Sequence, residues 1–170
     1  RFTALWSTAA ANSQQIVGMG DNGDGYFFGY NGTSFGILHK NAGIETWIPQ
    51  ASWNIDKMDG SGPSGVNLSM AKSQILFIDL EWLGVGRVRF GFVIDGSIYY
   101  VHQLLNTNNL DKVYMTTADL PVRGEIENTS GGNIDSMKMI CTSVNSEGGF
   151  SKVGFPFSVG NGAAIKTLTT

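Results

Sequence analysis

The sequence predicts an all-β protein, an antiparallel β-sandwich, and three observations support this fold class. Short runs of β-branched and aromatic residues recur about every eight to fifteen residues, a spacing typical of sandwiches and barrels. Gly, Asn and Asp separate these runs, and 23 of the 170 residues are glycine. No segment combines the apolar spacing and the capping residues of a long amphipathic helix. Without crossover helices, a parallel α/β architecture is disfavoured.

The predicted strands follow this pattern in chain order. We expect them at residues 2–7, 15–20, 25–30, 34–40, 46–50, 74–83, 87–94, 97–105, 112–116, 122–128, 136–145, 149–154 and 155–159. One helical turn is expected at 68–72, and surface loops at 59–65 and 129–133. Asn31-Gly32 and Asp95-Gly96 are dipeptides favoured in tight hairpin turns, because the central residues of such turns need positive φ.

The most regular hairpin pattern lies at the centre of the chain. Apolar and acidic residues alternate over 78–82, which places Asp79 and Glu81 on the polar face of a half-buried strand. Arg87 and Arg89 occupy the same face of the following strand. If the turn at Gly84 to Gly86 sets the register, opposite charges meet across the strands, each pair contributing about 0.2–1 kcal/mol. These charged residues are therefore interpreted as setting the register of the two strands and not as a functional site.

Composition and charge argue against two classes of partner, nucleic acids and membranes. With 11 basic and 14 acidic residues, a formal net charge of -3 and basic residues dispersed along the chain, no nucleic-acid partner is expected. No apolar run approaches the length of a membrane span, so membrane insertion is not expected.

Residues 1–170 are interpreted as a single domain, and the start at Arg1 as a sign of a module or fragment of a longer chain. The lone Cys141 excludes an intrachain disulfide and favours folding in a reducing compartment.

Catalytic chemistry has few candidates. His39 and His102 each lie on a predicted strand beside apolar residues, with no recognisable motif around them. Asp79 and Glu81 share a strand face at a separation that glycosidase carboxylates use, but the next residues are Trp82-Leu83-Gly84, without the further acid that such enzymes usually carry. No catalytic residue and no cofactor are therefore assigned, and a glycan hydrolase is the least favoured alternative.

Aromatic residues offer a better binding prospect. Trp47 and Trp53 flank a short polar segment outside the strongest strands, and Asn54 and Asp56 follow directly. Exposed tryptophan rings stack on sugar faces, while amide and carboxylate groups bind hydroxyls. These four residues form a candidate carbohydrate-binding site, with core packing as the alternative. Tyr26, Phe28 and Phe27 also make one strand aromatic on both sides.

A tight acidic loop is the one candidate metal site. Asp21 and Asp24 offer oxygen ligands of the kind that calcium prefers. The loop lacks the distal bidentate glutamate of an EF-hand, so a turn with side-chain capping by aspartate is favoured and no metal is assigned.

Two resemblances extend these predictions. The central ribbon has a strand ending in Glu81-Trp82, a turn, a strand ending before Asp95-Gly96 and a third strand. It resembles the centre of concanavalin A-like and laminin G-like jelly rolls, which implies a jelly-roll sandwich but does not by itself imply sugar binding. A longer series of phrases resembles virion structural proteins of tailed bacteriophages, including those of cyanobacteria. The phrases are FGYNGTSFG at 28–36, WIPQ at 47–50, EWLGVGRVRFGF at 81–92, VYMTT at 113–117 and LPVR at 120–123.

The phage resemblance spans roughly residues 25–128 in matching order, and Gly124 departs from it where a bulky strand residue is expected, which suggests a bulge. It implies a non-enzymatic virion structural protein of the tail, a fibre or the capsid surface, acting in assembly, host attachment or both. The implied partners are other copies of the chain, with a trimer favoured, other virion proteins and a host surface glycan. Such a protein folds in the host cytoplasm and is exposed on the particle. The alternative is a lectin-like carbohydrate-binding module.

Overall fold

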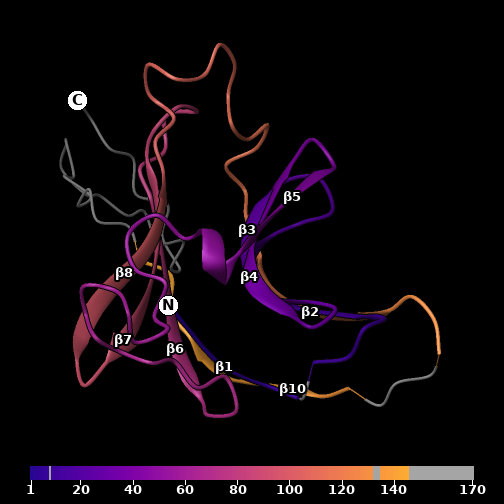
Figure 1. The fold of residues 1–170 in the computed structure, drawn as a ribbon. Coiled ribbons are helices and arrows are strands. Elements are labelled where there is room, and N and C mark those ends of the chain that lie inside the picture. The colour runs from indigo at the N-terminus through magenta and orange to yellow at the C-terminus, as the bar shows by residue number, and fades with distance from the viewer. Residues whose placement is uncertain (8, 132–134, 146–170) are drawn as a thin grey trace, which may run out of the picture.

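The computed structural model describes residues 1–7, 9–131 and 135–145, which form two antiparallel five-stranded sheets (Figure 1). The first sheet contains, in spatial order, β10 (Met137–Thr142), β1 (Phe2–Trp6), β6 (Gln74–Leu80), β7 (Val88–Ile94) and β8 (Ser97–Leu104). The second contains β5 (Ile44–Pro49), β4 (Ser34–Asn41), β3 (Gly25–Asn31), β2 (Ser13–Gly20) and β9 (Val122–Asn128). The predicted all-β, antiparallel sandwich is confirmed.

Several predicted elements differ from the structure. The strand predicted at 112–116 is wrong: this segment pairs with no strand of either sheet, and Tyr114 N donates instead to Gly84 O of the β6–β7 turn at 2.9 Å. β6 ends at Leu80, earlier than predicted. At 68–72, where one helical turn is expected, the structure has a single hydrogen-bonded turn, closed by Lys72 N donating to Ser69 O at 3.1 Å. A short 3-10 helix that was not predicted, η1, forms at Gln50–Ser52. The strands predicted at 149–154 and 155–159 lie outside the described residues.

The core lies between the two sheets and is mainly aromatic. Tyr26 and Phe28 of β3 face Phe90 and Phe92 of β7, and all four side chains are buried. Phe28 and Phe90 meet edge to face, with centroids 5.7 Å apart and planes at 82°. Aromatic pairs prefer this geometry to a face-to-face sandwich. The alternating pattern of β3 and β7 thus determines which side chains enter the core.

A second, smaller apolar cluster lies on the other face of the second sheet. Phe27 points away from the core because its neighbours on β3 point into it. Phe27, Ile16 and Leu38 are fully buried there, and the half-buried Trp47 of β5 packs against them. The prediction that β3 is aromatic on both faces is confirmed.

The hairpin turns partly follow the prediction. Asp95 and Gly96 both have positive φ, at 50° and 81°, as a type I′ turn requires. The β3–β4 hairpin forms, but its two central residues are Gly32 and Thr33. Of these, only Gly32 has positive φ, at 59°, which is the pattern of a type II′ turn.

Gly124 does not mark a bulge. The β2–β9 register runs without a shift from Ser13 opposite Asn128 to Met19 opposite Val122. A Cβ atom at Gly124 would collide with the sulfur of Met139 on β10. Glycine at this position therefore leaves room for the Met139 side chain of the neighbouring sheet.

Among the described residues, no helix is long and apolar enough to cross a membrane.

Candidate interaction surface at one end of the sandwich

The structure does not bring the predicted carbohydrate-binding residues together. Trp53 is only 3% exposed and packs in the core against Phe28 and Phe92, so its ring offers no free face to a sugar. The expectation of an exposed Trp53 is corrected: η1 turns the chain inward just before this residue, with Trp53 N donating to Gln50 O at 3.1 Å. Trp47 lies on β5, in the outer apolar cluster instead.

Asn54 and Asp56 have structural contacts. Asn54 donates from Nδ2 to Gln103 O and accepts from Gln103 N, both at 2.9 Å, so its amide extends the ladder at the edge of β8. A side chain that occupies the backbone groups of a sheet edge in this way protects the edge from pairing with other chains. Asp56 is buried and accepts hydrogen bonds from Met58 N at 2.7 Å and Ser64 N at 2.8 Å. Burial raises the pKa of Asp56, but these hydrogen bonds outweigh it and the pKa is lowered overall.

The acidic loop forms the predicted capped turn. Asp21 Oδ1 accepts hydrogen bonds from Gly23 N at 2.7 Å and Asp24 N at 2.8 Å. Asp24 is buried, and its carboxylate accepts from Ala42 N at 3.1 Å and from the hydroxyl of Thr116. Both carboxylates are thus occupied by protein donors. Within the described residues, no group of three or more His, Cys, Asp or Glu side chains could hold a metal ion.

The charged residues of the β6–β7 hairpin also have structural contacts. Asp79 and Arg89 lie opposite each other on β6 and β7 and form the predicted ion pair. Glu81 lies beyond the end of β6, where its carboxylate accepts a long hydrogen bond of 3.4 Å from Arg87 N. His102 Nδ1 accepts from Asn54 N at 3.2 Å, and burial lowers the pKa of this histidine.

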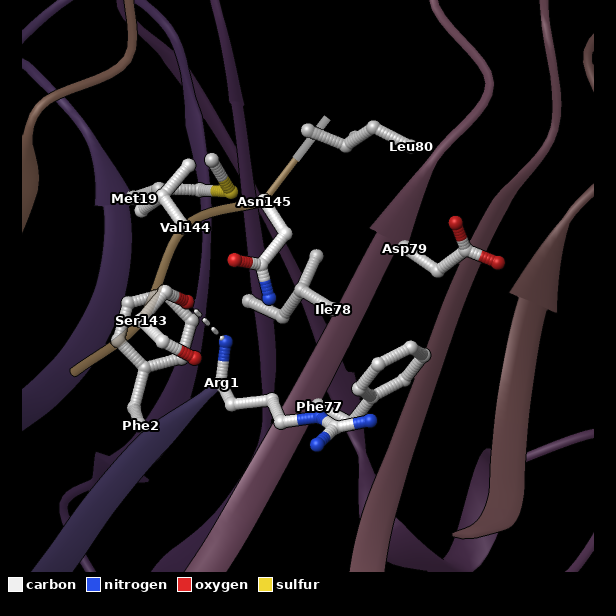
Figure 2. A pocket seen from close by; sticks show the side chains of 10 residues that line it. All are labelled: Arg1, Phe2, Met19, Phe77, Ile78, Asp79, Leu80, Ser143, Val144 and Asn145. Atoms are coloured by element: carbon white, nitrogen blue, oxygen red, sulfur yellow. Dashed lines mark hydrogen bonds between the residues drawn. The ribbon is translucent and has the colours of Figure 1, made fainter. Parts of the chain in front are cut away.

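One cavity, of about 300 Å³, opens beside β1, β6 and the end of β10 (Figure 2). Phe2, Met19 and Ile78 contribute apolar walls. The Arg1 amine donates to Ser143 O at 2.8 Å, the Arg1 guanidinium lies over the Phe77 ring at 5.7 Å from its centroid, and Asp79 pairs with Arg89. The cavity is at the small end of the range for ligand pockets, and we assign it no ligand.

The most unusual surface lies at one end of the sandwich, in two loops near the top of Figure 1. The loops are the β6–β7 turn at 81–87 and the long β8–β9 connection at 105–121. They expose five large apolar side chains, which we call the apolar crest. Its members are Leu83 (83% exposed), Leu105 (55%), Val113 (49%), Leu110 (42%) and Trp82 (39%).

Hydrogen bonds fasten these two loops to each other. Tyr114 N donates to Gly84 O at 2.9 Å, Asn106 Nδ2 to Gly86 O at 2.7 Å and Thr107 Oγ1 to Val85 O at 2.9 Å. The ring of Tyr114 also packs edge to face against that of Trp82, with centroids 6.0 Å apart. The apolar crest is therefore formed by two loops that are distant in sequence and are joined by hydrogen bonds.

The β8–β9 connection is also anchored to the second sheet. The Thr116 hydroxyl donates to Asp24 at the start of β3, and His39 Nε2 lies 3.1 Å from Tyr114 O. Tyr26 stacks on His39 with centroids 4.7 Å apart. Burial lowers the pKa of His39, and its contacts with Tyr114 and Asp24 offset only part of this effect. A neutral His39 that donates from Nε2 fits this geometry.

Leu83 is the crest residue that is hardest to explain by folding alone. Its φ of 101° lies in the region that favours glycine, and bulky side chains at positive φ typically cost about 1–3 kcal/mol. Its side chain is nearly free of internal contacts at 83% exposure. The position therefore combines backbone strain with an exposed apolar side chain.

The sequence analysis did not identify the apolar crest because it assigned residues 82–83 and 112–116 to strands. The overlooked signal was an apolar pair, Trp82-Leu83, placed directly before the glycine-rich turn at Gly84 to Gly86. Comparison with known proteins adds no assignment: no family model matches the chain, and neither the curated proteins nor the solved structures searched gave a match.

Proposed function

We propose that this chain is a non-enzymatic structural module of a bacteriophage virion, a jelly-roll sandwich belonging to a tail, fibre or capsid-surface component. Its role is assembly of the particle, attachment to the host, or both. The observation that carries the proposal is the apolar crest. It supports a role in assembly because the surface is ordered, apolar and made by loops held on a rigid two-sheet scaffold.

Two further features support the same proposal. The phage-like phrase at 81–92 contains the crest residues Trp82 and Leu83, so the resemblance and the exposed surface coincide. Of the titratable residues considered for catalysis, Asp79 is paired with the side chain of Arg89, and His39 Nε2 contacts the backbone oxygen of Tyr114. Aromatic and large apolar residues are also typical of the centres of protein interfaces.

Purified virions provide the test. Mass spectrometry of the particle should detect the chain, and cryo-EM of the same particle should locate a two-sheet domain whose apolar crest faces a neighbouring subunit. The location would distinguish tail, fibre and capsid. Absence of the chain from purified virions would contradict the proposal.

A lectin-like module is the second candidate, and Trp47 favours it. Its ring is only half-buried on the outer face of the second sheet, beside the ion pair of Lys40 and Glu45, whose charged atoms are 2.8 Å apart. A glycan array should then show binding that Trp47→Ala abolishes and that Trp82→Ala, a change in the apolar crest, preserves. Equal binding by both variants, or none by the native chain, would exclude this role for Trp47.

A further inference from the structure

A short segment after η1 covers the free edge of β8. This edge cover consists of Asn54, Ile55 and Asp56. The backbone N–H groups of Ile55 and Asp56 both donate to Val101 O at 3.1 Å, and the Asn54 side chain pairs with both backbone groups of Gln103 at 2.9 Å. Because β8 is the last strand of its sheet, no neighbouring strand satisfies these outward-facing groups. The edge cover therefore takes the place of a further strand.

His102 lies between the two covered residues of β8 and holds the edge cover through a bond that depends on its protonation. Its Nδ1 accepts a hydrogen bond from Asn54 N at 3.2 Å. A neutral imidazole that accepts at Nδ1 carries its proton on Nε2. The Nε2 atom is buried and has no hydrogen-bond partner among the described residues. The contact with Asn54 therefore requires the neutral form of His102.

A second proton on His102 reverses this contact. The proton binds the lone pair of Nδ1, which then becomes a donor and no longer accepts from Asn54 N. Two N–H groups then face each other across the former hydrogen bond. We propose that His102 is an acid-sensitive latch, whose protonation releases Asn54 and uncovers the edge of β8 at Gln103. The latch is a property of the fold and does not require the virion role.

The groups packed around His102 do not compensate for a second charge. In the edge cover, the buried carboxylate of Asp56 is held by two backbone N–H groups. On β7, Phe90 packs against the imidazole, and the adjacent Arg89 is itself cationic. From the second sheet, Tyr26 packs against Phe90, and burial raises the pKa of this tyrosine, which stays neutral. Burial is the cause that shifts the pKa of His102, and it lowers that pKa.

His39 is a histidine of the same fold without this property. Its Nε2 lies 3.1 Å from Tyr114 O, and a carbonyl oxygen accepts from Nε2 in both the neutral and the protonated ring. A second proton enters at Nδ1 and leaves that contact in place. The charge of Asp24 also favours the protonated form. Acid therefore places a charge in a partly buried site at His39, whereas at His102 it also breaks a hydrogen bond.

Hydrogen exchange at the Gln103 amide measures the opening, because this amide donates to Asn54 Oδ1. If the closed form excludes the second proton, the open fraction grows as the histidine of the open form titrates, with a pKa of about 6.5. The protection factor of Gln103 should therefore fall about tenfold between pH 7.5 and pH 5.5. It should also be lower than that of Phe28, because β3 lies between two strands and exposes its amides only on global unfolding.

His102→Gln removes the titration and keeps an acceptor. The glutamine oxygen accepts from Asn54 N at every pH, so protection of Gln103 should not change between pH 7.5 and pH 5.5. His39→Gln is the matched control, the same change at the other of the two histidines, and should retain the fall. An equal fall in His102→Gln and the native chain, or a fall that His39→Gln abolishes, would overturn the latch.

NMR of the native chain tests the latch without a substitution. The imidazole nitrogen signals of His102 should show a protonated Nε2 and an unprotonated Nδ1 at pH 7.5. Nδ1 should gain its proton over the pH range in which protection of Gln103 falls. A proton on Nδ1 at pH 7.5, or protonation of His102 that leaves Gln103 protected, would contradict the proposal. Equal protection of Gln103 and Phe28 would also contradict it, since the edge would then open only with the whole fold.

Discussion

The two turns at opposite ends of β7 perform the same task with different chemistry. At the β7–β8 end, Asp95-Gly96 supplies residues that suit positive φ, and a Cβ at Gly96 would have open space within 4 Å. At the β6–β7 end, Leu83 takes positive φ against its preference, and the turn is joined to the β8–β9 connection by hydrogen bonds. The first turn is explained by chain reversal alone. The second has features that chain reversal does not require.

The largest expected effect comes from Gly86→Ala in the β6–β7 turn. A Cβ there would collide with the backbone oxygens of Glu81 and Trp82, which cannot move without opening the turn. We expect a loss of about 3 kcal/mol or more in the free energy of unfolding, at the upper end of the cost of overpacking. Chemical denaturation measures it. A loss below that of Gly96→Ala would mean that this turn is not tightly packed.

Asn106→Ala should have the next largest effect. The buried side chain of Asn106 donates to Gly86 O at 2.7 Å, so its removal leaves a buried carbonyl without this partner. We expect about 1–3 kcal/mol of destabilisation. Asn108→Gly is the comparison: Asn108 is exposed with φ of 61°, so glycine there should be neutral or slightly stabilising. Equal effects of the two changes would show that the link between the loops contributes little.

Gly96→Ala tests how much the β7–β8 turn depends on the positive φ of Gly96. No atom obstructs the new methyl group, so the cost is the backbone conformation alone, with φ of 81°. About 1–2 kcal/mol is expected, the penalty of a left-handed conformation for a residue with a side chain. Thermal unfolding with calorimetry would determine it. An unchanged stability would indicate that the turn adjusts to a conformation without positive φ.

Acid should destabilise the fold through His39, which holds the β8–β9 connection against the second sheet. The folded pKa of His39 is lowered by burial, so the unfolded chain binds its proton first as pH falls. The stability associated with neutral His39 is therefore present above the unfolded pKa of about 6.5 and declines as pH falls from there towards the folded pKa. Unfolding from pH 8 to pH 5 should show this decline, and His39→Gln should flatten it. His102 shifts in the same direction, so some decline should persist in that variant.

The smallest expected change in stability is that of Leu83→Gly. Relief of strain favours the folded state, while the added freedom of glycine in the unfolded chain opposes it by about 0.5–1 kcal/mol. The net effect should be a gain of at most about 1 kcal/mol. A marked loss instead would show that Leu83 packs within the fold, and the contrast between the two turns of β7 would disappear.

Much of the fold could be predicted from local patterns. Alternation identified the faces of β3, β6 and β7, and the opposite charges of Asp79 and Arg89 were correctly paired because antiparallel register follows from a short turn. The Asx turn at Asp21 was also predicted, because aspartate caps its own backbone within a few residues. These features depend on neighbours in sequence or on adjacent strands.

The candidate sites show where local patterns fail. Trp53 and Trp47 have similar sequence surroundings, yet one is in the core and the other on the outer sheet face. Their difference arises from η1, which redirects the chain between them. Tyr114 and Met115 resemble part of a strand, but the β8–β9 connection buries both while it crosses between the sheets.

The sequence by itself determined the all-β class, most strand positions and the polarity of each strand face, because these follow from period-two patterning and turn residues. Only the tertiary structure decided that Trp53, Asn54 and Asp56 serve the core and the edge of β8. It alone also brought Gly84 beside Val113, because that contact needs two loops about thirty residues apart to meet. Such long-range packing is not encoded in any short segment.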